Sequence, residues 1–288
     1  MVAIAPRERT FFYNDMTFHA QEWGEPGGLP VLALHGWLDN AASFYRLAPL
    51  LKHCHIIAVD MAGHGRSDHR PGNHPYNLLS EVNDVYGIAE LLGWEKFALL
   101  GHSRGAIVSM LTAGTFPERV SAVVMIDGLW PLPVLAAETP QILAQSILEN
   151  NNLRKIRHPV YATRELMKRA LVNSRWSYLP EAADALLERG ITEVEGGYIW
   201  STSPHLKTAS SFKLTEEHIE AFVKRIAAPV QLIVATDGLP KMFPQYQDDI
   251  ALFNTIEVVT MAGKHHLHMG PEAVKLADTI NSFFARLT

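Results

Sequence analysis

The pentapeptide Gly-His-Ser-Arg-Gly at residues 101–105 constrains the fold of this chain most strongly. It follows the apolar run Phe-Ala-Leu-Leu at 97–100 and precedes residues 106–111, whose spacing is typical of a helix. A strand that turns at once into a helix can hold a serine at its apex only if small residues flank it, because larger side chains would collide with neighbouring chain. The pattern therefore predicts that Ser103 lies exposed on a sharp turn at a sheet edge.

A serine at such a turn is suited to attack an acyl carbon. The helix that follows directs its N-terminal amides, and the positive end of its dipole, toward charge that forms on a bound carbonyl group. A serine hydroxyl is a weak nucleophile at neutral pH, so it needs a base within hydrogen-bond reach and a third group that orients the base. A glycine-rich turn with a solvated serine is the competing interpretation, and the flanking strand and helix disfavour it.

Continuous apolar runs that alternate with helical patterns predict an α/β fold, in which helices cover both faces of a mostly parallel sheet. Residues 9–23 alternate apolar and polar on both sides of Asn14 and Asp15, which predicts an antiparallel hairpin at a sheet edge. A closing amphipathic helix is predicted over 271–287, with Pro271 in its first turn. Buried strands are predicted at 31–34, 56–59, 97–100, 123–126, 230–234 and 256–259.

No strand-like apolar run is predicted between Ile126 and Val230, where helical patterns occupy 141–150, 164–172 and 180–189. This insertion leaves and rejoins the carboxyl edge of the sheet, the edge at which ligands bind in open α/β folds. We expect residues 130–215 to form a helical cap above Ser103, and residues 1–129 and 216–288 to form the core. A helical excursion away from the site is the alternative.

A histidine-rich loop, residues 262–269, follows the last predicted strand and therefore lies at the same sheet edge as Ser103. His265 is the candidate base. The three histidines at 265, 266 and 268 could also indicate a metal site, but no cysteine or carboxylate cluster with ligand spacing accompanies them. The sequence therefore predicts no metal and no cofactor.

Four motifs in this order resemble those of the α/β-hydrolase superfamily, and the resemblance covers nearly the whole chain. They are Leu-His-Gly-Trp at 34–37, Asp-Met-Ala-Gly-His-Gly-Arg-Ser at 60–67, the pentapeptide at 101–105 and Gly-Lys-His at 263–265. Within the superfamily, the chain looks most like the serine hydrolase-like proteins. That narrower resemblance rests on 35–40, 101–105, 186–190 and 264–269.

The resemblance implies an α/β-hydrolase fold and a role for each matching residue. Ser103 would be the nucleophile, and His265 the general base and then the general acid. The backbone N–H groups of Trp37 and Arg104 would form the oxyanion hole, the pair of donors that stabilises negative charge on the carbonyl oxygen. The other two histidines of the loop are expected to pack around the site or support it.

The acid of the triad departs from the commonest pattern of the superfamily. Most relatives carry it shortly after the strand matched here by 232–234, but the aligned position is Gly238 and Asp237 comes one residue earlier. Asp127, directly after the strand that ends at Ile126, is a second position that some members use. We favour Asp127, because a one-residue shift in a tight loop redirects a side chain, and keep Asp237 as the alternative.

Other features narrow the class of protein. The formal net charge of -5 comes from mixed acidic and basic residues without a basic stripe, so we expect no nucleic-acid partner. The glycines at 63 and 65 lack the ending of a phosphate-binding loop and predict a structural turn. Trp37 and Trp130 are candidates for the wall of an acyl pocket, and Cys54 is expected to be buried.

The N-terminus lacks a sustained apolar stretch after a basic start, and no segment is long enough to cross a bilayer. We therefore expect a cytoplasmic protein without a membrane span. Its oligomeric state does not follow from the sequence.

Together, these observations predict a cofactor-independent carboxylesterase that cleaves small or medium esters through an acyl-enzyme intermediate. Hydrolysis of thioesters, lactones or carbon-carbon bonds, and acyl transfer, would use the same residues. A serine at position 103 disfavours haloalkane dehalogenase and epoxide hydrolase chemistry, for which relatives place aspartate there. The rival of another class is a non-catalytic protein that uses the fold to bind a ligand.

Overall fold

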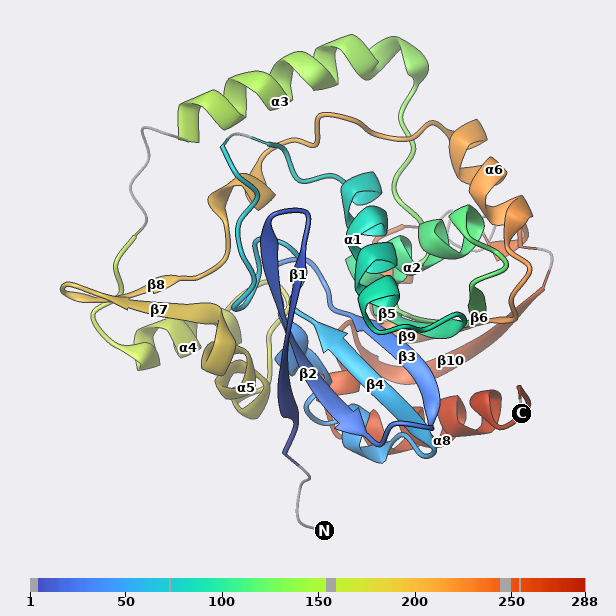
Figure 1. Ribbon diagram of the computed structural model, residues 1–288. Coiled ribbons are helices and arrows are strands. Elements are labelled where there is room, and N and C mark those ends of the chain that lie inside the picture. The colour runs from blue at the N-terminus through green and yellow to red at the C-terminus, as the bar shows by residue number, and fades with distance from the viewer. Residues whose placement is uncertain (1–4, 73, 154–158, 244–249, 254, 288) are drawn as a thin grey trace.

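A computed structural model describes residues 5–72, 74–153, 159–243, 250–253 and 255–287. Its centre is an eight-stranded sheet in the order β1-β2-β4-β3-β5-β6-β9-β10 (Figure 1). Strand β2 pairs antiparallel with both β1 and β4, and all other neighbours are parallel. The strands are β1 (Arg7–Tyr13), β2 (Met16–Gly24), β3 (Leu29–Leu34), β4 (Cys54–Val59), β5 (Phe97–His102), β6 (Val120–Ile126), β9 (Val230–Asp237) and β10 (Ile256–Lys264). The predicted mostly parallel sheet is confirmed.

Each predicted strand lies within an observed one. The predicted N-terminal hairpin is formed by β1 and β2. Asn14 and Asp15 form its turn with φ angles of 50° and 56°, which short polar side chains tolerate better than most. Strands β4 and β5 are buried along their whole length, as expected of central parallel strands. Strand β10 differs, because it pairs only with β9 at the sheet edge and most of its residues are exposed or half-buried.

Helices cover both faces of the sheet, and alternate residues of each strand serve the two resulting cores. Leu32 and Leu34 of β3 pack with α1 (Leu78–Leu91), α2 (Arg104–Thr115) and α6 (Glu216–Arg225). Val31 and Ala33 pack on the other face with α8 (Ala273–Phe284). Helix α8 begins after Pro271, because Glu272 is its N-cap, so Pro271 precedes the helix and is not in its first turn. Cys54 is buried, as predicted, and burial raises the pKa of its thiol to about 11.

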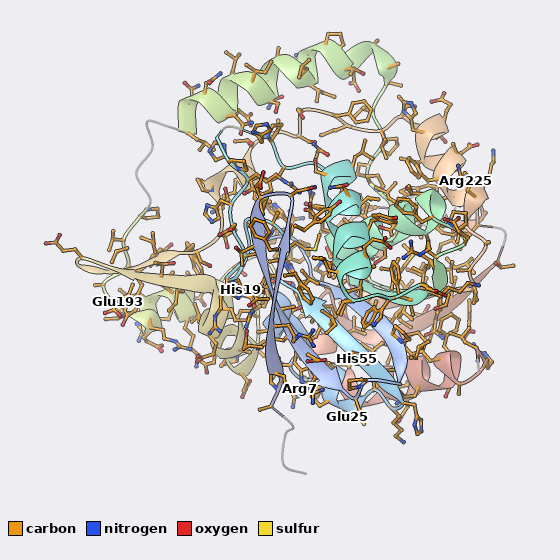
Figure 2. The ribbon with its side chains drawn as sticks, in the orientation of Figure 1. Arg7, His19, Glu25, His55, Glu193 and Arg225 are labelled. Atoms are coloured by element: carbon orange, nitrogen blue, oxygen red, sulfur yellow. The ribbon has the colours of Figure 1, made fainter. Side chains whose placement is uncertain are left out.

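Residues 130–215, the predicted cap, contain the three predicted helices and a β-hairpin that the sequence analysis missed; helix α6, which follows before β9, was not predicted either. The helices are α3 (Thr139–Leu153), α4 (Arg164–Val172) and α5 (Pro180–Gly190). The missed element is a hairpin of β7 (Ile191–Val194) and β8 (Gly197–Trp200), whose turn uses Gly196 and Gly197 at φ 86° and 143°. Glu193 lies near the outer end of this hairpin, away from the sheet (Figure 2).

Arg189 of α5 joins the insertion to the core. Its guanidinium is 1% exposed, with Nη2 2.7 Å from Asp60 Oδ2 and Nη1 2.6 Å from Glu8 Oε1. A guanidinium this deeply buried is tolerated only with such charged partners. Asn40 Nδ2 also donates to the carbonyl oxygen of Leu186, at 2.9 Å. The insertion is therefore attached to the loops that follow β3 and β4.

Among the helices of the described residues, none is long and apolar enough to cross a membrane. The expectation of no leader rests on the N-terminal residues, and residues 1–4 lie outside the described part of the chain.

Candidate active site

Ser103 occupies a strained turn between β5 and α2. Its φ of 52° and ψ of −114° lie outside the regions that non-glycine residues ordinarily adopt. A Cβ atom on Gly101 would lie 2.3 Å from the carbonyl oxygen of Gly105, and one on Gly105 would lie 2.0 Å from that of Leu34. The predicted requirement for small flanking residues is confirmed.

The same turn lies against the end of β6. The amide of Ser103 donates to the carbonyl oxygen of Ile126 at 2.9 Å, and a Cβ atom on Gly128 would lie 2.4 Å from the carbonyl oxygen of Ser103. Ser103 is therefore next to the loop that carries Asp127.

His265 and Asp127 meet at this edge. Nδ1 of His265 is 2.7 Å from Oδ2 of Asp127, whose side chain is fully buried. The amides of Ala235 and Leu239 donate to Asp127 Oδ1 and Oδ2, each at 3.0 Å. Because a carboxylate accepts, the Nδ1 of His265 carries the proton and Nε2 is free to accept one. Burial lowers the pKa of His265 from its usual value, and the hydrogen bond from Nδ1 to Asp127 opposes that shift.

Asp237, the alternative acid, does not contact His265. Its exposed carboxylate pairs instead with Lys241. Position 238, where the superfamily pattern most often places the acid, is a glycine here. A Cβ atom on Gly238 would lie 2.1 Å from Asp127 Oδ2, so this position has no room for a side chain. The space taken by a side chain at 238 is thus occupied by the carboxylate of Asp127.

His265 also contacts residues that the sequence analysis did not connect with it. The ring of Trp176, from the insertion, stacks on the imidazole with centroids 4.4 Å apart and an interplanar angle of 29°. Nε2 of His102, the residue before Ser103, is 3.0 Å from the carbonyl oxygen of His265. This contact holds the histidine loop against the turn that bears Ser103. Sequence spacing carried no signal for the Trp176 contact, because 89 residues separate the two in the chain.

Trp37 and Arg104 lie where the loop after β3 meets the start of α2. The amide of Arg104 opens the helix and so has no partner within it. The Arg104 side chain pairs with Glu81, with Nη2 2.7 Å from Glu81 Oε1. Nε1 of Trp37 donates to the carbonyl oxygen of Leu206 at 3.0 Å. The ring of Trp130, the other candidate for the acyl pocket, packs on Phe253 with centroids 6.4 Å apart.

A buried carboxylate, Asp39, lies beneath the histidine loop and was not identified from the sequence. The hydroxyl of Tyr178 donates to its Oδ1 at 2.7 Å, and Nε2 of His266 is 3.4 Å from its Oδ2. Burial acts to raise the pKa of Asp39, but His266 and the Tyr178 hydroxyl outweigh it and hold the pKa at about 2. His266 and the Tyr178 hydroxyl therefore favour the ionised form of Asp39.

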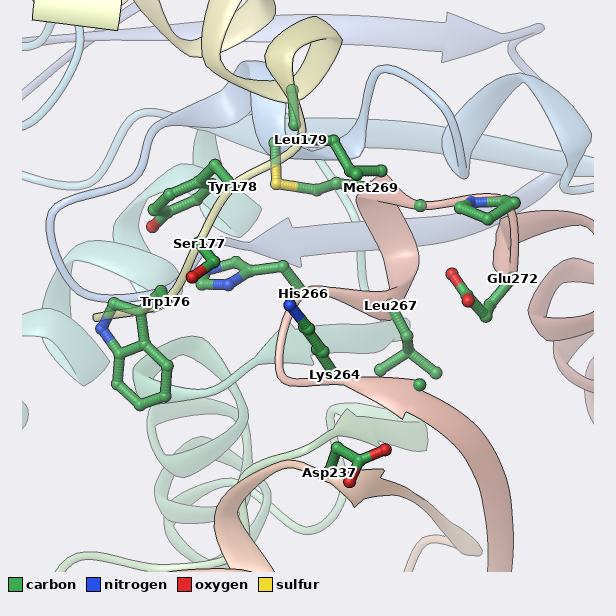
Figure 3. A pocket seen from close by; sticks show the side chains of 14 residues that line it. Trp176, Ser177, Tyr178, Leu179, Asp237, Lys264, His266, Leu267, Met269 and Glu272 are labelled. Atoms are coloured by element: carbon green, nitrogen blue, oxygen red, sulfur yellow. The ribbon is translucent and has the colours of Figure 1, made fainter. Parts of the chain in front are cut away.

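A pocket of about 250 Å³ opens beside the histidine loop, on a wall formed by Trp176, Tyr178 and His266 (Figure 3). Lys264, Asp237 and Glu272 are the charged residues around it. Ser103 and Asp127 are not among the residues that line it. The pocket therefore gives access to His266 and not to the serine hydroxyl.

Comparison with known proteins places this geometry in a family. Residues 30–186 match the family model described as alpha/beta hydrolase fold, and the chain belongs to that family. Among curated proteins, it is 33% identical over 270 residues to the serine hydrolase-like protein of Danio rerio, covering 90% of this chain and 83% of the relative. It is 31% identical over 285 residues to serine hydrolase-like protein 2 of Homo sapiens, covering 92% and 89%.

A solved structure of a hypothetical protein from Pseudomonas aeruginosa PAO1 is also similar. Its TM-score is 0.93 at 41% identity, over 98% of this chain and 100% of that one. The resemblance to the serine hydrolase-like proteins is therefore confirmed along most of the chain.

Proposed function

We propose that this protein is a serine hydrolase that cleaves small or medium carboxylic esters through an acyl-enzyme intermediate. Ser103 Oγ attacks the carbonyl carbon while His265 Nε2 takes the hydroxyl proton. The tetrahedral intermediate then collapses, and His265 gives that proton to the departing alkoxide. Water attacks the acyl-serine with His265 again as base, which releases the acid and restores Ser103.

Asp127 holds the base in its working tautomer in this scheme. Its hydrogen bond fixes the proton of His265 on Nδ1 and stabilises the imidazolium that forms at each transfer. The amides of Trp37 and Arg104 hold the oxyanion, and loss of one such donor typically raises the barrier by about 3 kcal/mol. The proposal is cofactor-independent, because each step uses only these groups and water.

One observation supports the proposal more than any other: the strained turn at Ser103 adjoins a preoriented imidazole–carboxylate pair. A φ of 52° at a non-glycine residue is strained, and strain of this kind is typical of functional sites. The 2.7 Å contact between His265 and Asp127 supplies the base and its orienting group in one arrangement.

We also propose that residues 130–215 act as a cap and that residues 1–129 and 216–288 form the catalytic core. Trp176 from this segment covers one face of His265, and Leu206 accepts the hydrogen bond from Trp37. These contacts support a role for the insertion in shaping the acyl pocket.

A panel of p-nitrophenyl esters from acetate to laurate tests the activity. We expect turnover of the short and medium esters, and no turnover above background by Ser103→Ala. Thioester and lactone substrates in the same panel separate the neighbouring acyl hydrolase activities. Turnover by Ser103→Ala at the rate of the wild type would contradict the role of Ser103, and no turnover by the wild type would contradict the proposal and favour a ligand-binding protein.

A further inference from the structure

Several buried polar atoms beside the histidine loop lack a hydrogen-bond partner within the described residues. They include Asp39 Oδ2, His102 Nδ1 and His266 Nδ1. The side chains of these three residues are 1%, 0% and 11% exposed. Native proteins pair nearly all such atoms, so a local group of unpaired ones calls for a ligand that the chain itself does not provide.

The tautomer of His102 identifies the kind of ligand. Because a carbonyl oxygen only accepts, the 3.0 Å contact with the backbone of His265 places the His102 proton on Nε2. Nδ1 therefore presents a lone pair, 3.8 Å from Asp39 Oδ2, which also presents lone pairs. Two facing acceptors favour a cation between them.

The spacing of Asp39 Oδ2 from one ring nitrogen each of His266 and His102 is close to that of ligands around a small metal ion. Ligands of a tetrahedral zinc ion with bonds of 2.0–2.1 Å lie about 3.4 Å apart. Asp39 Oδ2 is 3.4 Å from His266 Nε2 and 3.8 Å from His102 Nδ1. Gly36 lies beside His102 Nδ1 and Asp39 Oδ2, where a Cβ atom would be 2.8 Å from Nδ1 and 3.0 Å from Oδ2.

The surrounding contacts are also those of metal-ligating histidines. Such residues donate their second N–H to a carbonyl or carboxylate group, which fixes the tautomer. His102 does so to the backbone of His265, and His265 does so to Asp127. One ring nitrogen from each of His102, His265 and His266 lies within 4.8 Å of the others.

We propose that His102, His265 and His266 bind a transition-metal dication such as Zn²⁺, with the carboxylate of Asp39 beside it, and that this ion inhibits the enzyme. Imidazole ligands with a single carboxylate favour zinc, cobalt, nickel or copper over magnesium and calcium. The ion would occupy the lone pair with which His265 accepts the proton of Ser103, so inhibition rests on the proposed function. The proposal departs from the expectation of no metal that the sequence analysis drew for the histidines of this loop.

The pocket beside the histidine loop offers the ion a route. His266 forms part of its wall, and its rim carries the carboxyl groups of Asp237 and Glu272 (Figure 3). These carboxylates attract a dication, and Lys264 offsets one of them. The ion therefore reaches His266 first and the buried Asp39 and His102 behind it.

Binding is tested with Co²⁺, whose visible absorption reports tetrahedral coordination, on the full-length chain. We expect this absorption for the wild type and for Ser103→Ala, and its loss when Zn²⁺ is added in excess. His266→Asn is expected to weaken binding at least about tenfold. His53→Asn removes an exposed histidine elsewhere and is the matched control, expected to bind as the wild type does.

The second readout is ester hydrolysis in the presence of Zn²⁺. We expect reversible inhibition that EDTA removes, with the same at least tenfold weakening in His266→Asn and none in His53→Asn. Hydrolysis that Zn²⁺ does not inhibit, without Co²⁺ absorption, would overturn the metal site and leave the proposed function intact. Co²⁺ binding by a chain that hydrolyses nothing would support the site and contradict the proposed function. Unchanged affinity in both His266→Asn and Asp39→Asn would also overturn the site.

Discussion

The neighbouring strands β6 and β9 each end near an aspartate, and the two side chains have opposite surroundings. Asp127, after β6, is fully buried and accepts from two backbone amides and from His265. Asp237, the last residue of β9, is exposed and forms a salt bridge with Lys241. Because β6 and β9 pair in parallel, both aspartates lie at the same edge of the sheet. Position on the edge is therefore not sufficient to make a carboxylate the partner of the base.

The loop after β9 decides between the two. The amide of Leu239 in this loop donates to Asp127, as does that of Ala235 near the end of β9, and Gly238 has no side chain to displace that carboxylate. Asp127 in turn adopts a φ of 44°, which aspartate tolerates better than most residues. Asp127, the proposed acid, thus accepts a hydrogen bond from the loop in which the superfamily pattern most often places the acid.

The largest expected effect comes from removal of the nucleophile, which either aspartate would support only through His265. Ser103→Ala should lower kcat by about 10,000-fold or more, because the covalent intermediate cannot form. Steady-state hydrolysis of the best p-nitrophenyl ester measures it, with the thermal unfolding midpoint as the control for folding. Residual activity near that of the wild type would mean that another residue attacks the ester.

Replacement of each aspartate by asparagine tests the comparison itself. Asp127→Asn should lower kcat by about 10,000-fold, because an amide no longer fixes the tautomer of His265. Asp237→Asn is the matched control and should stay within about twofold of the wild type, since exposed ion pairs contribute little. Reversal of these two results would transfer the role to Asp237.

Gly238→Ala sharpens the argument about space. Its φ of −103° suits alanine, so the expected loss comes from the overlap with Asp127 Oδ2. We expect kcat to fall by about 100-fold, or about 2.7 kcal/mol in the barrier. A double-mutant cycle with Asp127→Gly checks the cause, because the penalty should vanish once the carboxylate is gone. An undiminished penalty in that background would locate the strain elsewhere.

The smallest expected effect is a partial transfer of the acid. Asp127→Gly vacates the space that a side chain at 238 needs, and glycine accepts the φ of 44° at that position. Adding Gly238→Asp should raise kcat by about tenfold over the single variant, or about 1.4 kcal/mol. No recovery, with an unchanged unfolding midpoint, would show that the loop after β9 does not direct a carboxylate toward His265.

The parts of this account that depend on local pattern could be read from the sequence. The apolar runs predict the strands, and the glycines at 101 and 105 predict the turn at Ser103, because each signal lies within a few residues. The choice between Asp127 and Asp237 as the acid remained open there, because it depends on how the loops after β6 and β9 fold against each other.

What the sequence could not reveal are contacts between distant segments. Tyr178 donates to Asp39, which lies 139 positions earlier in the chain. Trp176 lies in the insertion and stacks on His265, which lies in the core near the end of the chain. The hairpin of β7 and β8 was missed because its strands are only four residues each, too short for a clear alternation. Short strands and side chains that meet only in the folded protein leave no periodic signal.

The rate of labelling by a fluorophosphonate, followed by intact-protein mass, tests most directly whether Ser103, His265 and Asp127 act together. The account predicts one adduct on the wild type at Ser103 and the same rate for Asp237→Asn. It predicts much slower labelling of His265→Ala and Asp127→Asn, and none of Ser103→Ala. Labelling of Asp127→Asn at the rate of the wild type, or an adduct that persists in Ser103→Ala, would contradict it.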